Sequence, residues 1–484
     1  MLHFKRNMKN NLYFTLCCIA CLLSMISCKK FLDVYPEDRF LQKQVFDNEN
    51  AVNSALNGIY LNMAKSTLYG SQLSMLDLDI MAQYYNSNLN TGILASYNYT
   101  STTTLSSFSS IWQSAYRTIL NANSFIEQIR QTEGVIDNNR KDIVLGEAYA
   151  IRAYLHFDML RLFGPVYTTD SLQLSIPYMT IPTDQIQSLL PANAVMDSVI
   201  RDLDRALVLL KNDPVRKEGV TELQNTDAIS NFYRMRNRRF NYYAVMGVKA
   251  RVLLYRKDYK GALSTAKAVI GEAGKYFPWS PATSSMPGAT NPDRSFSSEI
   301  ILGFQNANMY NQHRDFFNVS LYDNRIIAPI PQRLDEIYEK LVNDYRYRVD
   351  WRDGGSAGKT YKTFIKYEDI NQQNVSFRGF QSLLRLSELY YIAAECETDP
   401  AQAIVFLNTV RINRGLPDLK AGANVTAELF KEYRKEFWGE GQTFFYFKRR
   451  ALTGIPSGSA DGFTIKMNAV KYVVPLPLAE IQNR

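Results

Sequence analysis

The sequence predicts a mainly α-helical protein, with helix pairs as a scaffold, long inserted loops and a small β-hairpin. Three observations lead to this prediction. Apolar residues recur at three- and four-residue spacing in several long segments, which is typical of helices with one buried face. Some of these segments follow one another across a short turn, as paired helices do. Long stretches that lack such spacing, rich in Tyr, Asn, Ser and Thr, lie between them.

The predicted helices are spread along the whole chain. The second is expected to end at Gly164-Pro165 and the last at Gly415, because glycine and proline commonly terminate helices. The predicted helices cover residues 111–129, 144–163, 194–210, 242–255, 259–270, 384–397 and 400–414.

Two stretches combine their helices into recognisable pairs. Residues 249–270, KARVLLYRKDYKGALSTAKAVI, alternate small and large side chains around a short turn. The alanines allow two antiparallel helices to approach closely, and the large residues fill the adjoining gaps. Residues 388–411, ELYYIAAECETDPAQAIVFLNTVR, follow the same logic. Both are similar to tetratricopeptide helix pairs, but their uneven spacing argues against a regular solenoid.

Three long loops are predicted between the helices, at residues 77–110, 276–296 and 304–325. Loops longer than about fifteen residues are unusual in compact domains and often carry function. Tyrosine pairs an apolar ring with a polar tip, which suits a wet binding surface. The alternative is that these loops only cap the helical scaffold.

The small hairpin is predicted around WRDGGSAGKT, residues 351–360. This stretch fits a G-x-S-x-G nucleophile motif and the end of a phosphate-binding loop. Both motifs need a strand before the loop and a helix after it. Before the loop, in YRYRVDW (345–351), aromatic or apolar residues alternate with charged ones. After it, YKTFIKY (361–367) alternates again. We therefore expect strand, glycine loop and strand, and no catalytic or phosphate-binding role.

The first 27 residues are predicted to be a lipoprotein signal peptide. Three basic residues precede an apolar run at 12–26 that is too short to span a membrane. The run ends in Met25-Ile26-Ser27-Cys28, which resembles a bacterial lipobox, so Cys28 is expected to carry lipid. An ordinary secretory signal followed by a chance cysteine is the alternative.

The composition of the mature chain argues against several other functions. Its net charge is modest and its basic residues are scattered except at residues 234–239, so no nucleic-acid partner is predicted. His156 and His313 are separate, and Cys396 lies in an apolar helical run, so no metal site or reactive thiol is expected. No cofactor and no enzymatic activity are predicted.

Seven short motifs, in order along the chain, resemble the SusD/RagB family of nutrient-binding outer-membrane lipoproteins. They are CKKFLDVYP (28–36), ALNGIY (55–60), IWQSAYRTILNAN (111–123), GEAYAIRAYLHFDMLRLFGPV (146–166), FLNTVRINRGLP (406–417), EFWGEGQTFFYFKR (436–449) and YVVPLPLAEIQNR (472–484).

This resemblance implies a single SusD-like domain over residues 28–484, with an N-terminal part to about residue 230 and a C-terminal part from about residue 231. It implies a non-catalytic lipoprotein, anchored in the outer membrane through Cys28 and exposed at the cell surface. Such a protein binds a glycan and passes it to a TonB-dependent SusC-like transporter. Two alternatives stay open: the same architecture binding peptides, and a scaffold lipoprotein that binds only proteins.

The resemblance also places ligand contacts in loops that match the three long loops of this chain. Aromatic rings can cover the faces of sugar rings while polar side chains meet the hydroxyls. The first loop has no tryptophan here, which leaves the ligand open. The candidate ligand-binding residues are Asp77, Asp79, Tyr97, Asn98, Tyr99, Trp279, Tyr310 and Tyr322.

Overall fold

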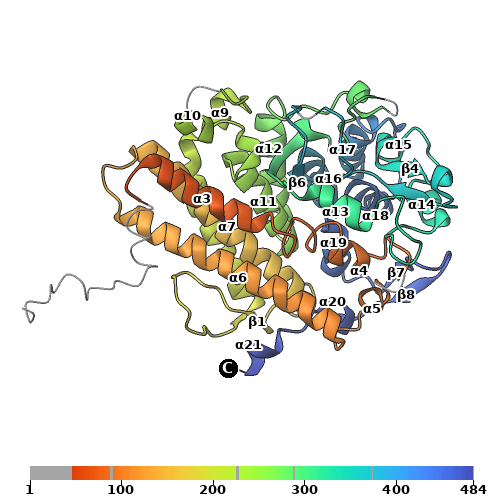
Figure 1. Cartoon of the computed structure of the whole chain (residues 1–484), viewed down its shortest axis with the longest axis horizontal. Helices are drawn as coiled ribbons and strands as arrows, with labels where there is room; N and C mark the ends of the chain where they lie inside the picture. The colour runs from red at the N-terminus through yellow and green to blue at the C-terminus, as the bar shows by residue number, and fades with distance from the viewer. Residues whose placement is uncertain (1–45, 88–90, 225–227, 287–288, 373, 483–484) are drawn as a thin grey trace, which may run out of the picture.

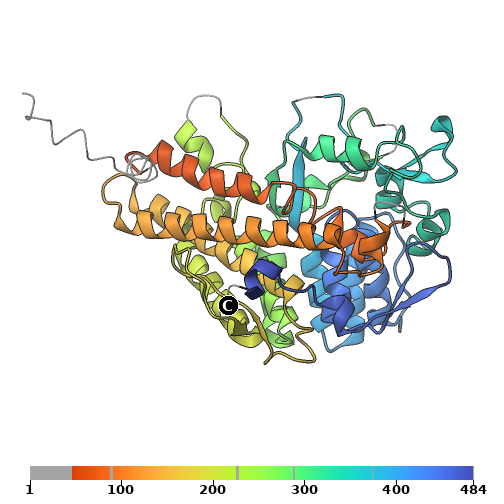
Figure 2. The same ribbon diagram turned by 60° about the horizontal axis from the view of Figure 1, so that its bottom comes forward.

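The longest helix of the fold, α6 (Thr102–Gln131), runs along much of the molecule, as Figures 1 and 2 show. α3 (Glu49–Met63) and α7 (Asn138–Phe163) pack against it. The computed structural model describes residues 46–87, 91–224, 228–286, 289–372 and 374–482. The predicted signal peptide and lipidation site at Cys28 lie outside the described residues.

The helical scaffold continues as a chain of neighbouring helices. α7 contacts α8, α8 contacts α11, and α11 pairs with α12; α12 then contacts α16, which pairs with α17. Ala262 and Ala266 of the α11–α12 pair are fully buried, as close packing requires. The mainly helical fold and its two helix pairs are thus confirmed. The bounds are α8 (Ala192–Leu209), α11 (Tyr242–Tyr255), α12 (Tyr259–Ala273), α16 (Leu386–Cys396) and α17 (Pro400–Ile412).

The remaining elements are short. The helices are α4 (Asp77–Met81), α5 (Gly92–Ala95), α9 (Val215–Glu218), α10 (Ala228–Phe232), α13 (Met309–Phe316), α14 (Pro331–Ile337), α15 (Tyr345–Asp350), α18 (Val425–Glu436), α19 (Gln442–Arg449), α20 (Ala469–Tyr472) and α21 (Leu478–Gln482). The 3₁₀ turns are η2 (Leu210–Asn212), η3 (Arg236–Arg238), η4 (Ala282–Ser285), η5 (Ser297–Glu299) and η6 (Gly355–Ala357).

The strands form antiparallel pairs of two. The pairs are β1 (Leu174–Ile176) with β2 (Leu190–Pro191), β3 (Ile300–Gln305) with β6 (Phe380–Arg385), β4 (Trp351–Asp353) with β5 (Lys362–Phe364), and β7 (Gly454–Pro456) with β8 (Thr464–Lys466). Among the described residues, no helix combines the length and the apolar character needed to cross a bilayer.

The predicted hairpin exists, but its first strand is shorter than expected. β4 pairs with β5 around the glycine loop, whereas residues 345–350 form the helix α15 instead of a strand. The Asp344 side chain caps this helix by accepting a hydrogen bond from the Arg346 backbone N–H at 3.0 Å. The alternation of aromatic and charged residues predicted a strand whose charged side chains face solvent. Arg346 is instead buried among acidic side chains.

Two predicted loops also contain regular structure. Residues 77–110 include α4, α5 and the first turns of α6, which begins where the Ser101 side chain accepts a hydrogen bond from the Thr104 N–H. Residues 304–325 include α13. The Ser- and Thr-rich start of α6 shows little helical periodicity, so the sequence placed the helix start nine residues too late.

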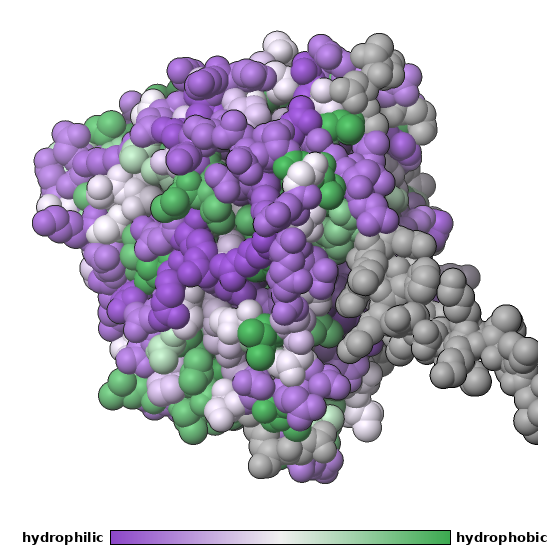
Figure 3. Space-filling model, turned by 90° about the vertical axis from the view of Figure 1, so that its left-hand side faces the viewer, coloured by the Kyte–Doolittle hydropathy of each residue, from purple (hydrophilic) through white to green (hydrophobic). Residues whose placement is uncertain are grey.

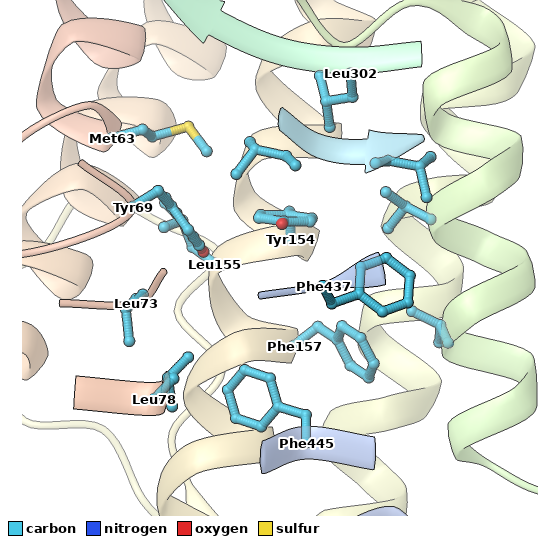
Figure 4. Packing of buried hydrophobic residues seen from close by; sticks show 14 of the residues in the cluster. Met63, Tyr69, Leu73, Leu78, Tyr154, Leu155, Phe157, Leu302, Phe437 and Phe445 are labelled. Carbon is cyan, nitrogen blue, oxygen red and sulfur yellow. The ribbon is translucent and has the colours of Figure 1, made fainter. Parts of the chain in front are cut away.

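The hydrophobic core lies around α7. Figure 4 shows Tyr154, Leu155 and Phe157 of this helix between residues from distant parts of the chain, such as Met63 and Phe445. One connected cluster of buried side chains reaches from Val52 to Val474. The end of the molecule at the left of Figure 1 is mainly hydrophilic, with small separate hydrophobic areas (Figure 3). α15 and β4 lie at the opposite end.

Candidate ligand-binding site

A cavity of about 660 Å³ lies beside α15 and β4. One wall comes from Met286 and residues 289–294, in the connection that leads to β3. A second wall comes from residues 348–352, and a third from residues 365–371, which follow β5. Four further cavities between described residues have volumes of about 240 to 450 Å³. Ligand sites usually occupy about 300 to 1,000 Å³, so this cavity is large enough for a small ligand.

The first wall is shaped by turn chemistry around Asp293. Its buried carboxylate accepts hydrogen bonds from the backbone and hydroxyl groups of Ser295 and Ser297, at 2.8 to 3.2 Å. Aspartate favours such turns because its short side chain reaches the backbone two residues further on. The turn places Arg294 against the third wall, where its guanidinium donates to the Glu368 carbonyl at 3.0 Å.

A reciprocal pair of hydrogen bonds joins the first and third walls. The Asn291 side-chain amide donates to Gln372 Oε1 at 3.1 Å, and the Gln372 backbone N–H donates to Asn291 Oδ1 at 2.8 Å. Both walls are loops, and this contact and the Arg294–Glu368 contact tie the two loops to each other.

The acidic groups of the cavity are already engaged by arginines. The Glu368 carboxylate accepts hydrogen bonds from Arg352 at 2.6 and 2.5 Å. The Asp369 carboxylate accepts from Arg378 at 2.9 and 2.8 Å, and these bonds lower its pKa. Bidentate arginine–carboxylate contacts fix both partners in orientation. The cavity therefore presents an ordered set of charged hydrogen-bonding groups.

Apolar side chains form the floor of the cavity. Val349, Trp351, Ile365 and Ile370 are all buried. Only 5% of Trp351 is exposed; its indole N–H donates to the hydroxyl of Tyr338 at 3.2 Å. The indole ring is thus part of the core, and little of its face is open to a ligand.

Two titratable groups lie near this floor. Asp350 is 3% exposed, its Oδ1 has no hydrogen-bond partner among the described residues, and burial raises its pKa to about 7. His313 is also buried, and burial lowers its pKa to about 4. Desolvation disfavours the charged form of each group, which explains the opposite directions of the two shifts.

Four of the sequence-predicted ligand residues lie in the core. The hydroxyls of Tyr97 and Tyr99 donate to the carbonyls of Met81 and Lys471, each at 2.6 Å. The other two are Asp77, whose pKa burial raises to about 6, and Asp79, which is fully buried.

Asp79 has a structural role in this position. Its carboxylate accepts the backbone N–H groups of Gly439 at 2.6 Å and Gly441 at 3.2 Å. For all four core residues, burial corrects the expectation of an open binding loop at residues 77–110. Asn98 of the same loop is exposed, and its Oδ1 accepts hydrogen bonds from the Thr100 N–H and hydroxyl.

The other predicted residues lie on segments around the cavity. The Trp279 ring is half-buried against Tyr390, with ring centroids 5.3 Å apart, at the base of the connection that forms the first wall. The Tyr310 ring lies 4.9 Å from the guanidinium of Arg378, which holds Asp369 of the third wall. None of these side chains lines the cavity itself.

Tyr322 projects beside the hairpin and is 78% exposed. The next residue, Asp323, is held by the Lys359 ammonium and the Tyr361 hydroxyl, each at 2.7 Å. Its segment is therefore tied to the glycine loop between β4 and β5.

Catalytic and metal-binding motifs have no supporting geometry in the described residues. Ser356 of the G-x-S-x-G match lies exposed on η6, between two strands and without a following helix. No group of three or more His, Cys, Asp or Glu side chains among the described residues is arranged to hold a metal ion. Cys396 is buried and burial raises the pKa of its thiol, which disfavours the reactive thiolate.

Comparison with known proteins identifies the family. Residues 30–254 match a family described as starch-binding and associating with the outer membrane, and residues 350–473 match the SusD family. The two matches together span most of the chain. The chain belongs to the SusD family. Members of the first matched family associate with the outer membrane, as its description states.

A curated relative supports the assignment. The SusD-like protein P25 of Formosa agariphila is 23% identical over 451 residues, which cover 81% of this chain and 79% of that protein.

Solved SusD structures share the fold. A SusD superfamily protein of Bacteroides thetaiotaomicron has a TM-score of 0.68 at 19% identity, with 90% of this chain and 98% of that chain covered. A putative sugar binding protein of Bacteroides vulgatus has a TM-score of 0.67 at 21% identity, covering 90% and 97%. A laminarin binding SusD-like protein has a TM-score of 0.63 at 18% identity, covering 90% and 98%. At these identities the likeness confirms the predicted SusD-like fold.

Sequence reasoning missed the charged residues of the cavity in this SusD-family chain. These are Arg294, Arg348, Arg352, Glu368 and Asp369. Two signals were available. The stretch around Asp293 has the Asn-Pro-Asp composition of a turn, and the residues beside the glycine loop carry several charges. Neither signal shows that the segments meet in space.

Proposed function

We propose that this protein binds a glycan in the cavity between residues 289–294, 348–352 and 365–371. It delivers the glycan to a partner TonB-dependent SusC-like transporter and performs no chemistry on it. One observation carries the proposal: a preformed cavity of about 660 Å³ with charged walls, in a chain whose family is described as starch-binding and outer-membrane-associated.

The cavity groups suit the hydroxyls of a sugar. Guanidinium groups donate hydrogen bonds, the carboxylates of Glu368 and Asp369 accept them, and the exposed side chain of Asn371 can do both. Because the walls are joined by Asn291 and Gln372, little conformational entropy is lost when a ligand enters.

The arrangement favours binding over catalysis. A general acid or base must reach a substrate atom to exchange a proton with it, and a bidentate arginine contact fixes a carboxylate in one orientation. Glu368 and Asp369 are held in this way by Arg352 and Arg378. We therefore assign no chemical step to them.

We further propose that residues 28–484 act as one domain, anchored at the cell surface through a lipidated Cys28. The continuous core from Val52 to Val474 supports a single domain. Each buried methylene of an acyl chain contributes about 0.8 kcal/mol, so several chains would hold the protein at the membrane. The mass of the mature N-terminal peptide tests the anchor. A multiply acylated Cys28 supports it, and an unmodified peptide with a different start contradicts it.

The glycan proposal is tested by calorimetry on residues 29–484, which keep every described residue. The panel contains plant, microbial and host glycans. We expect one glycan to bind in the wild-type protein and to bind more weakly in Asn371→Ala. The matched control is Asn98→Ala, which removes an exposed asparagine from the loop first predicted to bind.

The pattern of losses locates the site. Loss of binding in Asn98→Ala with Asn371→Ala intact would move the site to the loop at residues 77–110. Folded protein that binds no glycan but retains peptides through purification would replace glycan with peptide cargo. Co-purification of a transporter with neither ligand would leave only the protein-binding scaffold.

A further inference from the structure

Cationic side chains outnumber accessible anionic ones in the cavity. Arg294, Arg348 and Arg352 all line it. The Glu368 carboxylate is shared, at 2.5 Å from Arg352 and 3.4 Å from Arg294. The Asp369 carboxylate is taken by Arg378, which does not line the cavity. The acids of the wall therefore leave part of its positive charge uncompensated.

Arg348 has no acidic partner among the described residues. It lies on α15 with its side chain half-buried against the cavity, and the described residues offer it no ion pair. No side chain or carbonyl of the described residues accepts a hydrogen bond from its guanidinium, so these N–H donors can serve a ligand.

Arg294 is also incompletely satisfied. It is 8% exposed, and its buried Nε has no hydrogen-bond acceptor among the described residues. Burial lowers the pKa of Arg294, and the carboxylates of Glu368 and, when ionised, Asp350 offset this effect only in part. An unpaired buried N–H of a charged group is costly. This Nε is closed to the cavity, so a ligand anion would stabilise Arg294 through its charge and not through a hydrogen bond to this atom.

The lining offers little aromatic surface for a neutral sugar. Trp351 is its only aromatic residue among those described, and 5% of it is exposed. The large apolar contact that an open aromatic ring gives to a sugar face is therefore small here. The walls therefore offer charged groups to a ligand and little ring surface on which a sugar could stack.

We propose that the glycan bound in this cavity is anionic, with carboxylate or sulfate-ester groups that meet Arg348 and lie near the positive charge of Arg294. This inference rests on the proposed function and specifies its ligand class. Arginine suits both groups because its planar fork donates two parallel hydrogen bonds to their oxygens.

Calorimetry with four ligands of similar length tests the inference. The ligands are a neutral oligoglucan, an oligogalacturonate, a sulfated oligogalactan and an oligoglutamate peptide. Each is titrated into the mature wild-type protein, into Arg348→Gln and into Arg201→Gln. Arg201 is an exposed arginine on α8, which contributes nothing to the cavity, and it serves as the matched control.

We expect an anionic oligosaccharide to bind the wild type at least about tenfold more tightly than the oligoglucan. Arg348→Gln should weaken that binding by about tenfold, and Arg201→Gln should leave it unchanged. Binding should also weaken as the salt concentration rises. The affinities for the oligogalacturonate and the sulfated oligogalactan, compared with each other, identify whether carboxylate or sulfate groups are preferred. Circular dichroism shows that each variant is folded.

The outcomes separate the inference from the proposed function. Equal affinity for neutral and anionic glycans, or no effect of Arg348→Gln, overturns the inference and leaves glycan binding intact. Binding of oligoglutamate alone overturns both and favours an acidic peptide cargo. If the folded protein binds none of the four ligands, the anionic inference is overturned. If it binds no glycan of the wider panel either, the proposed function is overturned.

Discussion

Asp350 should make the protein less stable as the pH rises from about 4 to about 7. Its carboxyl group is buried next to the cavity floor, and its Oδ1 has no hydrogen-bond partner among the described residues. Burial raises its pKa from 3.8 to about 7, although Lys366, Arg294 and Arg385 act in the opposite direction; Glu440 adds to the rise. The protonated form is therefore the form that the fold accommodates.

The sign and size of the effect follow from linkage. The folded protein holds this proton more tightly than the unfolded chain does, so the contribution of Asp350 to stability is greatest below pH 4. It is lost as the pH rises to about 7, after which it changes no further. The interval between 3.8 and about 7 corresponds to about 4 kcal/mol.

Asp350→Asn removes the ionisable group and keeps the size of the side chain. The free energy of unfolding, measured with urea at pH 5 and pH 8, should increase in the variant relative to the wild type. The increase should be about 2 to 3 kcal/mol larger at pH 8 than at pH 5. Asp353→Asn is the matched control, because Asp353 lies on the same hairpin with its side chain 86% exposed. It should show no comparable change with pH.

Two results would refute this reasoning. If Asp350→Asn changes stability equally at both pH values, the carboxyl group does not titrate between them. If the variant loses stability at pH 8, the ionised carboxylate is needed there to balance the surrounding cations. The second result would show that Lys366, Arg294 and Arg385 outweigh the cost of burial.

Two further predictions concern the helical scaffold. Asp213→Ala should lower the free energy of unfolding by about 3 to 5 kcal/mol in urea, because it strips a bidentate partner from the fully buried Arg236; a loss below about 1 kcal/mol would contradict the structure. His156 accepts the Met179 N–H at 2.9 Å, and burial lowers its pKa to about 3. The contribution of neutral His156 to the free energy of unfolding is complete above pH 6.5 and falls by about 3 kcal/mol when the pH drops to 4. His156→Gln should therefore lose less stability than the wild type between pH 7 and pH 4, as measured by urea titration at the two pH values. Equal acid sensitivity of the two proteins would show that His156 is accessible to protons.

Periodicity predicted the scaffold helices well because their buried faces are continuous. Residues 242–255 were predicted as a helix, and α11 has these bounds. The start of α6 was missed because, of residues 102–110, only Thr104 and Phe108 are buried. A helix segment with so few core contacts leaves almost no apolar signal in the sequence.

Buried charge caused the error at α15. The pattern assumed that charged residues face solvent, yet Arg346 is buried and lies within 3.0 Å of Asp344, Glu432 and Glu436. Its partners Glu432 and Glu436 are more than eighty residues away in the sequence. Local alternation cannot reveal such long-range pairing, so a helix was read as a strand.

The tyrosines of the first long loop were misjudged for a related reason. Tyr, Asn and Ser suit a wet binding surface, but a tyrosine can also be buried when its hydroxyl finds an acceptor. Tyr99 finds one in the carbonyl of Lys471, 372 residues further along the chain. Composition alone does not distinguish a loop whose polar groups await a ligand from a loop whose polar groups are satisfied internally.

The position of Trp279 connects the scaffold to the candidate site. Its ring lies 5.5 Å from the guanidinium of Arg414, which also binds Glu299 at 2.6 Å. The carboxylate of Glu299 in turn accepts the backbone N–H of Ser280, the residue next to Trp279. Buried ion pairs therefore fix the base of the connection that forms the first wall. A cavity wall built on such a base keeps Arg294 in place before any ligand arrives, and preorganised charge is what selective binding of a hydrated anionic sugar requires.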